Sequence, residues 1–121
     1  MAFNRTEINK EQIINITTTV ANTSSITPNS DTTSIVYQNN IQVIGNLTIN
    51  ADIGVYQQNG KSLLFKITST NIQTFIWNTQ YKGGNVPLPL QTTGGGHTDY
   101  YSFIWCNICN GWQYIGGAGG F

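Results

Sequence analysis

The chain has 121 residues, a length that suits one compact domain with a single modest core. Only 8% of the residues are charged, five basic and five acidic, and no basic cluster points to nucleic acid or to an anionic membrane surface. No apolar run is long enough to span a membrane, and no secretory signal is visible at the N-terminus.

Asn, Thr and Gln, about a third of the chain, replace the missing charged residues. Amide and hydroxyl side chains can be buried against a neighbour at a lower desolvation cost than Lys or Glu. A net charge of zero also favours association over solubility. The composition therefore favours a self-associating protein, although the codon usage of a low-GC genome would give the same bias.

Residues 1–25 form the first predicted element, an extended N-terminal arm. Charged residues gather in its first half, and residues 13–28 are rich in Thr and Ser, with apolar residues too sparse for a helical stripe. Because such a segment has too few apolar side chains to fold alone, we expect it to grip a capsid or a neighbouring subunit. The expected anchoring residues in the arm are Ile13, Ile14 and Ile16.

Residues 26–121 form the second predicted unit, a β-sandwich domain. Apolar and polar residues alternate with a period of two over residues 35–38, 41–50, 63–68 and 72–77, and two aromatic-rich strands follow at 100–106 and 112–115. Turn signals separate these runs, and Asn59-Gly60 and Asn110-Gly111 are typical of hairpins. Short strands at this spacing predict an all-β, antiparallel sandwich with a jelly-roll-like arrangement.

Few residues could support catalysis. His97, Asp99 and Ser102 are close in sequence, but they run from a glycine loop into a strand and bring no oxyanion donors, so we interpret them as polar residues at a strand entry. Cys106 and Cys109 lack the further ligands of a zinc site and the βαβ setting of a redox motif. We expect them to flank a tight turn, as free thiols or as a cross-turn disulfide, while a metal shared around a symmetry axis stays an alternative.

Aromatic rings and the C-terminal tail are the remaining candidates for binding. Adjacent rings such as Tyr100 and Tyr101 must face opposite sides of a strand, so some rings lie outside in any arrangement. Core and subunit interface explain most of these rings, but a sugar-binding role is a second hypothesis. Its expected contacts are Trp77, Tyr81 and Tyr101. The glycine-rich tail ends at Phe121, either as a loose end or, as we expect, as an anchor that docks into a pocket.

A family resemblance covers residues 25–121. The segments SITPNSDTTSIVYQNN, LTINADIG, NGKSLLFKI, TFIWNTQYKGG, LPLQTTGGGHTDYYSFIW and GWQYIGGAGGF, in this order, resemble the small β-sandwich domain of virion proteins of tailed bacteriophages. The resemblance implies a β-sandwich, frequent trimerisation and residence in the particle, and it brings no catalytic residues. The sequence departs from the family at His97, where a Lys is usual, and at the two cysteines, where polar residues are usual.

We therefore expect a non-enzymatic structural protein of a virus particle, of the capsid-decoration or head-fibre type. It would form a homotrimer, bind the major capsid protein or another virion protein through its arm, and use no cofactor, nucleic acid or membrane. The alternative is a tail-associated, receptor-binding knob that recognises host glycans. An enzyme is the third hypothesis.

Overall fold

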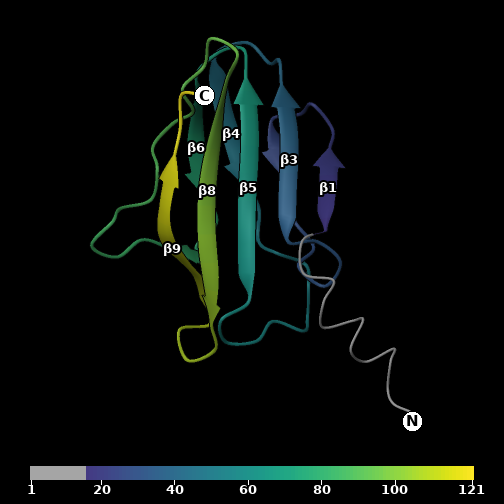
Figure 1. Ribbon diagram of the computed structural model, residues 1–121, viewed down its shortest axis with the longest axis vertical. Coiled ribbons are helices and arrows are strands. Elements are labelled where there is room, and N and C mark those ends of the chain that lie inside the picture. Colours follow the sequence, from purple (N-terminus) through teal and green to yellow (C-terminus); the bar gives the residue numbers. More distant parts are fainter. Residues whose placement is uncertain (1–15) are drawn as a thin grey trace.

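The computed structural model describes residues 16–121, which fold into two β-sheets packed face to face (Figure 1). The larger sheet has six strands in the order β1-β3-β5-β8-β9-β7, and the smaller has three in the order β2-β4-β6. No helix is present in these residues, so none could cross a membrane. The strands are β1 (Thr17–Val20), β2 (Ser25–Ile26), β3 (Ile35–Asn40), β4 (Gly45–Ile49), β5 (Ser62–Ser69), β6 (Gln73–Trp77), β7 (Tyr81–Lys82), β8 (His97–Cys106) and β9 (Gly111–Ala118).

From β1 to β6 the chain alternates between the two sheets, so that each strand is followed by a strand of the opposite sheet. Successive strands of one sheet are therefore parallel: β1, β3 and β5 in the large sheet, and β2, β4 and β6 in the small one. β7 also pairs in parallel with β9. Among the strand pairs of residues 16–121, only β5–β8 and β8–β9 are antiparallel.

The predicted all-β class is confirmed. The predicted antiparallel pairing holds for β5–β8 and β8–β9 but is wrong for the parallel pairs, and the jelly-roll-like arrangement is not confirmed. Parallel neighbours need a crossover connection. From β1 to β6 each crossover is a strand of the opposite sheet, whereas β7 and β9 are connected through β8 of their own sheet. Periodicity predicts that a segment is a strand without indicating its partner. The Asn110-Gly111 hairpin between β8 and β9 is confirmed, with Asn110 at φ 52°. Asn59-Gly60 precedes β5 but makes no hairpin, since β4 and β5 lie in different sheets.

The core fills the space between the sheets. β5 shows the predicted alternation, with Leu63, Phe65 and Ile67 buried and the residues between them half-buried on the outer face. The aromatic rings of the core meet mostly edge to face, as in the Phe65–Phe103 pair, whose centroids are 5.7 Å apart. The buried apolar residues are Ile26, Val36, Leu47, Ile49, Leu63, Phe65, Ile67, Phe75, Tyr81, Tyr101, Phe103, Trp105 and Trp112.

Buried amides explain part of the unusual composition. Gln38 and Asn40 are fully buried at the end of β3. The Gln38 amide donates to the carbonyls of Ala21 and Thr23, at 2.8 and 3.0 Å, and the Asn40 amide donates to Gln38 at 3.0 Å. These amides satisfy backbone groups of the β1–β2 connection that the sheets leave unpaired.

The prediction that residues 1–25 form an arm is wrong for residues 17–25. β1 pairs with β3, and β2 pairs with β4, so residues 17–25 include strands of both sheets. Ile16 is bound to the large sheet, since its N–H donates to Ser34 Oγ at 2.8 Å and its carbonyl accepts from Ser34 N–H at 2.9 Å. Ile13 and Ile14 lie outside the described residues.

Candidate binding surfaces

The three residues predicted to contact a glycan lie in or against the core, and this corrects the prediction. Tyr81 and Tyr101 are buried, and Trp77 is half-buried against them. The Trp77 indole N–H donates to Pro89 O at 2.9 Å, and the Tyr81 hydroxyl donates to Asn50 O at 2.9 Å. Tyr81 and Tyr101 are too deeply buried to stack on a sugar, and the Trp77 ring is stacked on Phe75 with centroids 4.7 Å apart.

Both buried tyrosines are kept neutral by their surroundings. Burial, reinforced by the nearby Asp52 carboxylate, raises the pKa of the Tyr81 hydroxyl well above its usual range. Burial and Asp99 raise the pKa of Tyr101 in the same way. These hydroxyls therefore act as hydrogen-bond donors in the core and not as acid–base groups.

The His97, Asp99 and Ser102 side chains do not form a catalytic triad. Asp99 is buried, and its carboxylate accepts from Thr93 N–H at 2.8 Å, Thr93 Oγ1 at 2.6 Å and Gly120 N–H at 3.0 Å. Ser102 lies on the opposite face of β8, since it is an odd number of residues away. Asp99 therefore ties the C-terminal tail and the segment before β8 to the sheet.

Cys106 and Cys109 form a disulfide across the β8–β9 turn. This selects the cross-turn disulfide from the two forms expected at a tight turn. Among residues 16–121, no group of three or more His, Cys, Asp or Glu side chains is placed to hold a metal ion.

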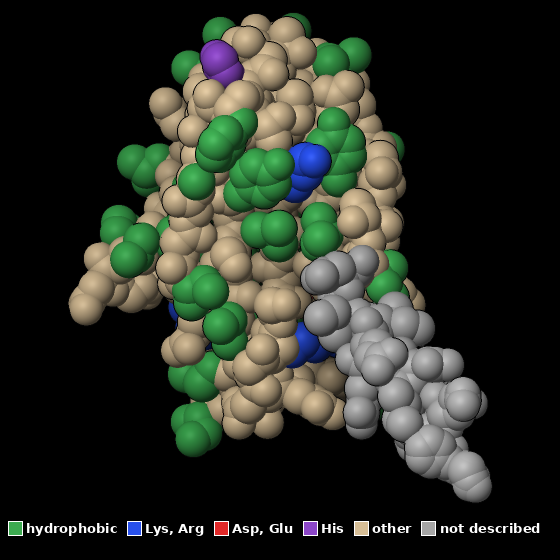
Figure 2. All heavy atoms as spheres, in the orientation of Figure 1, with side chains coloured by type: hydrophobic (Ala, Val, Ile, Leu, Met, Phe, Trp, Pro, Cys, Tyr) green, Lys and Arg blue, Asp and Glu red, His purple; other side chains and the backbone are tan. Residues whose placement is uncertain are grey.

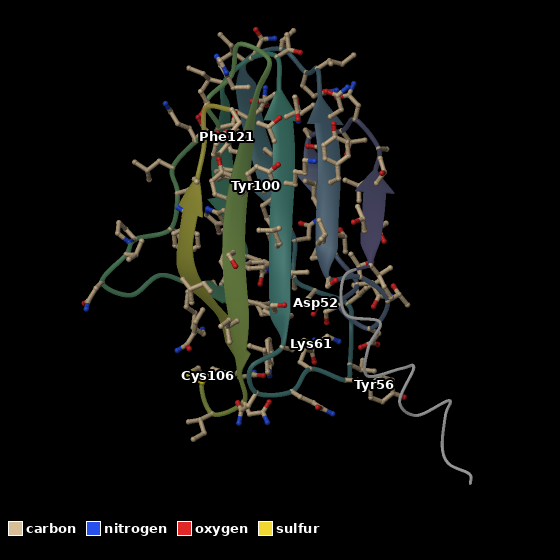
Figure 3. All side chains as sticks on the ribbon, in the orientation of Figure 1. Asp52, Tyr56, Lys61, Tyr100, Cys106 and Phe121 are labelled. Atoms are coloured by element: carbon tan, nitrogen blue, oxygen red, sulfur yellow. A yellow bond between two sulfur atoms is a disulfide. The ribbon has the colours of Figure 1, made fainter. Side chains whose placement is uncertain are left out.

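Asp52 is the second buried carboxylate, and it joins two loops at one end of the molecule (Figure 3). It accepts from Ser30 N–H at 2.8 Å, Ser30 Oγ at 2.5 Å, Gly54 N–H at 2.9 Å and Gln57 Nε2 at 3.0 Å. Burial alone would raise the pKa of Asp52, but these hydrogen bonds outweigh it, and the pKa lies below its ordinary value of 3.8. All acceptor positions are used, so the carboxylate stabilises the fold and has no capacity left for a substrate.

A cavity of about 380 Å³ lies beside this end, between the turn at residues 30–34 and the start of β5. Lys61 and Asp31 line it, together with hydroxyl side chains and backbone. The Asp31 carboxylate is occupied by the backbone N–H groups of Val55 and Tyr56 at 3.0–3.1 Å. Within residues 16–121, the cavity lining therefore presents one ammonium group and no nucleophile–base pair.

The C-terminal Phe121 packs against β8 of the same chain. Its backbone exchanges two hydrogen bonds with Thr98, at 2.9 and 3.2 Å, which extends the pairing along the start of β8. Its ring meets Tyr100 edge to face with centroids 5.8 Å apart, and the two side chains lie together on the large sheet (Figure 3). The side chain is still 69% exposed, so a surface is left for a partner.

The outer face of the large sheet carries a row that sequence reasoning did not select, formed by Tyr37, Lys66 and Tyr100. These residues are directly opposite one another on β3, β5 and β8. The Lys66 ammonium is 5.3 Å from the Tyr37 ring centroid and 5.8 Å from that of Tyr100. Figure 2 shows this face, where hydrophobic side chains surround a Lys and no Asp or Glu is visible among the described residues. The alternation within each strand indicated which residues share the outer face. It could not indicate that Tyr37, Lys66 and Tyr100 lie side by side, because that depends on the register between strands.

A second unpredicted surface is the apolar tip, defined as residues 41–44 between β3 and β4. Ile41, Val43 and Ile44 are 60%, 80% and 74% exposed. The sequence predicted residues 41–50 as one strand with Ile41 and Val43 on the same face as Leu47. This is wrong for the first part, because β4 begins only at Gly45.

The apolar tip is held by side-chain amides from three neighbouring segments, so its apolar side chains project from a fixed backbone. Buried Gln73 contributes one of these amides. The bonds run from Ile41 N–H to Asn22 Oδ1 (2.9 Å), from Gln42 N–H to Asn40 Oδ1 (3.0 Å), from Asn71 Nδ2 to Gln42 O (3.0 Å) and from Gln73 Nε2 to Val43 O (2.9 Å).

Comparisons of the chain with protein-family models, with curated proteins and with solved structures gave no match. The fold class therefore depends on the structure itself, and function must be argued from the surfaces described above.

Proposed function

We propose that this protein is a non-enzymatic structural protein of a virus particle that associates with copies of itself, as a trimer, and with a capsid or other virion protein. The observation that carries the association is the apolar tip. An exposed apolar cluster on a rigid support is typical of a protein–protein contact.

The energetics favour burial of the tip. Fully burying one Val or Ile side chain contributes about 1.5–3 kcal/mol, and the tip exposes three. The amide bonds that fix its backbone reduce the entropy lost on binding. The tip contains no charged residue, so its burial leaves no ion unpaired.

Residence in a particle and the trimeric state are supported by the resemblance of residues 25–121 to the sandwich domain of phage virion proteins. Attachment is assigned to residues 1–15, including Ile13 and Ile14, and to the exposed Phe121. Ile16 contributes less to the proposed attachment, because its backbone is already hydrogen-bonded to Ser34 in the same chain.

The association is tested by light scattering coupled to size-exclusion chromatography. The purified full chain is expected to be a trimer, and a Val43→Asp/Ile44→Asp variant a monomer. Ile108→Asp is the matched control, since Ile108 is 97% exposed in the β8–β9 turn and should leave the trimer intact. A wild-type monomer at about 100 µM, or a variant that still forms trimers, would contradict a role for the tip in self-association.

Attachment to the particle is tested with the chain lacking residues 1–15. The truncated protein is expected to fold and to be missing from particles assembled in its presence. Normal incorporation of this protein would refute anchoring by the N-terminal segment. The alternative, a glycan-binding knob, loses its predicted contacts because Tyr81 and Tyr101 are buried.

A further inference from the structure

The outer face of the large sheet has the chemistry of a binding surface for an acidic polymer. We propose that the row Tyr37–Lys66–Tyr100, extended by Phe121, binds a glycan whose sugars carry carboxylate groups. This inference goes beyond the proposed function and does not depend on it. The apolar tip carries the self-association, and the row shares only Phe121 with the residues assigned to attachment.

The geometry of the row suits an extended chain of sugars. Tyr37 pairs with Lys66 in register, and Lys66 pairs with Tyr100, so the three side chains stand on one face of three neighbouring strands. Since neighbouring strands are about 4.8 Å apart, the two tyrosines are separated by roughly 10 Å. Rings at this separation can contact alternate sugars of an extended glycan, while the sugar between them lies over Lys66.

The surroundings of the row add aromatic and hydroxyl groups. The Phe121 ring continues the row beyond Tyr100. Thr68 and Thr98, which share a hydrogen bond of 2.6 Å, are in register one pleat further along the same outer face. Such a face combines apolar rings with polar groups that can orient a ligand. It is an open sheet surface, which suits a polymer more than an enclosed small molecule.

Charge selects an acidic ligand. The three side-chain carboxylates of residues 16–121 are those of Asp31, Asp52 and Asp99, and each is engaged elsewhere by the hydrogen bonds described above. Lys66 is therefore positioned by two ring faces without an acidic partner among these residues. A ligand carboxylate would supply the missing opposite charge at the centre of the row.

The same charge argues against two other occupants. A second copy packed face to face on this sheet, with the two-fold axis through the row, would bring two Lys66 ammonium groups together, which is unfavourable. Nucleic acid is normally bound by a groove with many basic residues, and this row contains one. An acidic glycan requires only one opposite charge beside the stacking rings.

The experiment is calorimetric titration of the full chain with three carboxylate glycans: tetragalacturonate, a hyaluronan tetrasaccharide and an α2,8-linked tetramer of sialic acid. Cellotetraose is the neutral comparison and an oligothymidylate the nucleic-acid comparison. At least one acidic glycan is expected to bind, at least tenfold more tightly than cellotetraose and the oligothymidylate. Its affinity should fall as salt is added.

The matched variants separate the row from the rest of the surface. Lys66→Gln and Tyr100→Ala are each expected to weaken binding at least tenfold. Lys61→Gln and Tyr56→Ala are the controls, because both side chains lie toward the other end of the molecule from Phe121 (Figure 3), and should leave affinity unchanged. Thermal unfolding confirms that each variant is folded.

Three outcomes would overturn the inference: no binding of any acidic glycan, equal affinity for cellotetraose or the oligothymidylate, or the same effect of Lys61→Gln and Lys66→Gln. A failed titration leaves the association proposal untouched, because the Val43→Asp/Ile44→Asp variant tests that surface separately.

Discussion

Replacing Asp52 tests whether a buried carboxylate holds the loops at one end of the sandwich. In Asp52→Ala, the donors Ser30 N–H, Ser30 Oγ, Gly54 N–H and Gln57 Nε2 lose their shared acceptor. A hydrogen bond to a charged group contributes about 1.5–3 kcal/mol, but bonds that share one acceptor are not additive. We expect a loss of about 3–5 kcal/mol in the free energy of unfolding, measured by urea titration, and a drop in Tm of about 12–20 °C.

The same carboxylate predicts how stability depends on pH. Its pKa is lower in the folded protein than its ordinary value of 3.8, so the folded state binds fewer protons than the unfolded state. Its contribution is complete only well above pH 3.8 and is lost progressively as the pH falls through 3.8 to the lower, folded value. The wild type should therefore lose stability between pH 5 and pH 2, and Asp52→Asn should lose less over the same interval.

Asp31→Ala is the matched control for Asp52→Ala, since Asp31 also accepts from the backbone of this loop but is exposed to water. It should cost about 1 kcal/mol or less. If Asp52→Ala also costs less than about 1 kcal/mol, or if both variants are equally destabilised, the buried network does not support the fold as argued.

Three further predictions concern the closing strands and the N-terminus. Gly119→Ala should destabilise the protein by about 1–3 kcal/mol, since a Cβ there would overlap the Asp99 carboxylate, whereas Gly84→Ala, with open space around it, should be neutral in the same urea titration. Cys106→Ser/Cys109→Ser should cost only about 1–2 kcal/mol, because the disulfide closes a very short loop; a loss above about 4 kcal/mol in thermal unfolding would contradict this. Deletion of residues 1–15 should leave a cooperative unfolding transition, while deletion of residues 1–20 removes β1 and should abolish it or cause aggregation; circular dichroism and chromatography distinguish the two, and equal behaviour would refute the role of β1.

The sequence by itself determined the secondary structure well and the contacts poorly. The period of two in residues 63–68 follows from the backbone geometry of a strand, and Asn110-Gly111 favours a turn whatever lies around it. Such local signals needed no knowledge of the rest of the chain. The same local reasoning also indicated that either Tyr100 or Tyr101 had to face outward.

Only the tertiary structure decided which ring faces outward and which strands are neighbours. Tyr101 is buried and Tyr100 is on the surface because β8 packs against β5 in one particular register. The parallel winding of β1 to β6 depends on connections between sheets, and a strand pattern carries no record of them. The row around Lys66 joins residues 29 and 34 positions apart in the chain (37, 66 and 100), so its existence depends on pairing between distant strands.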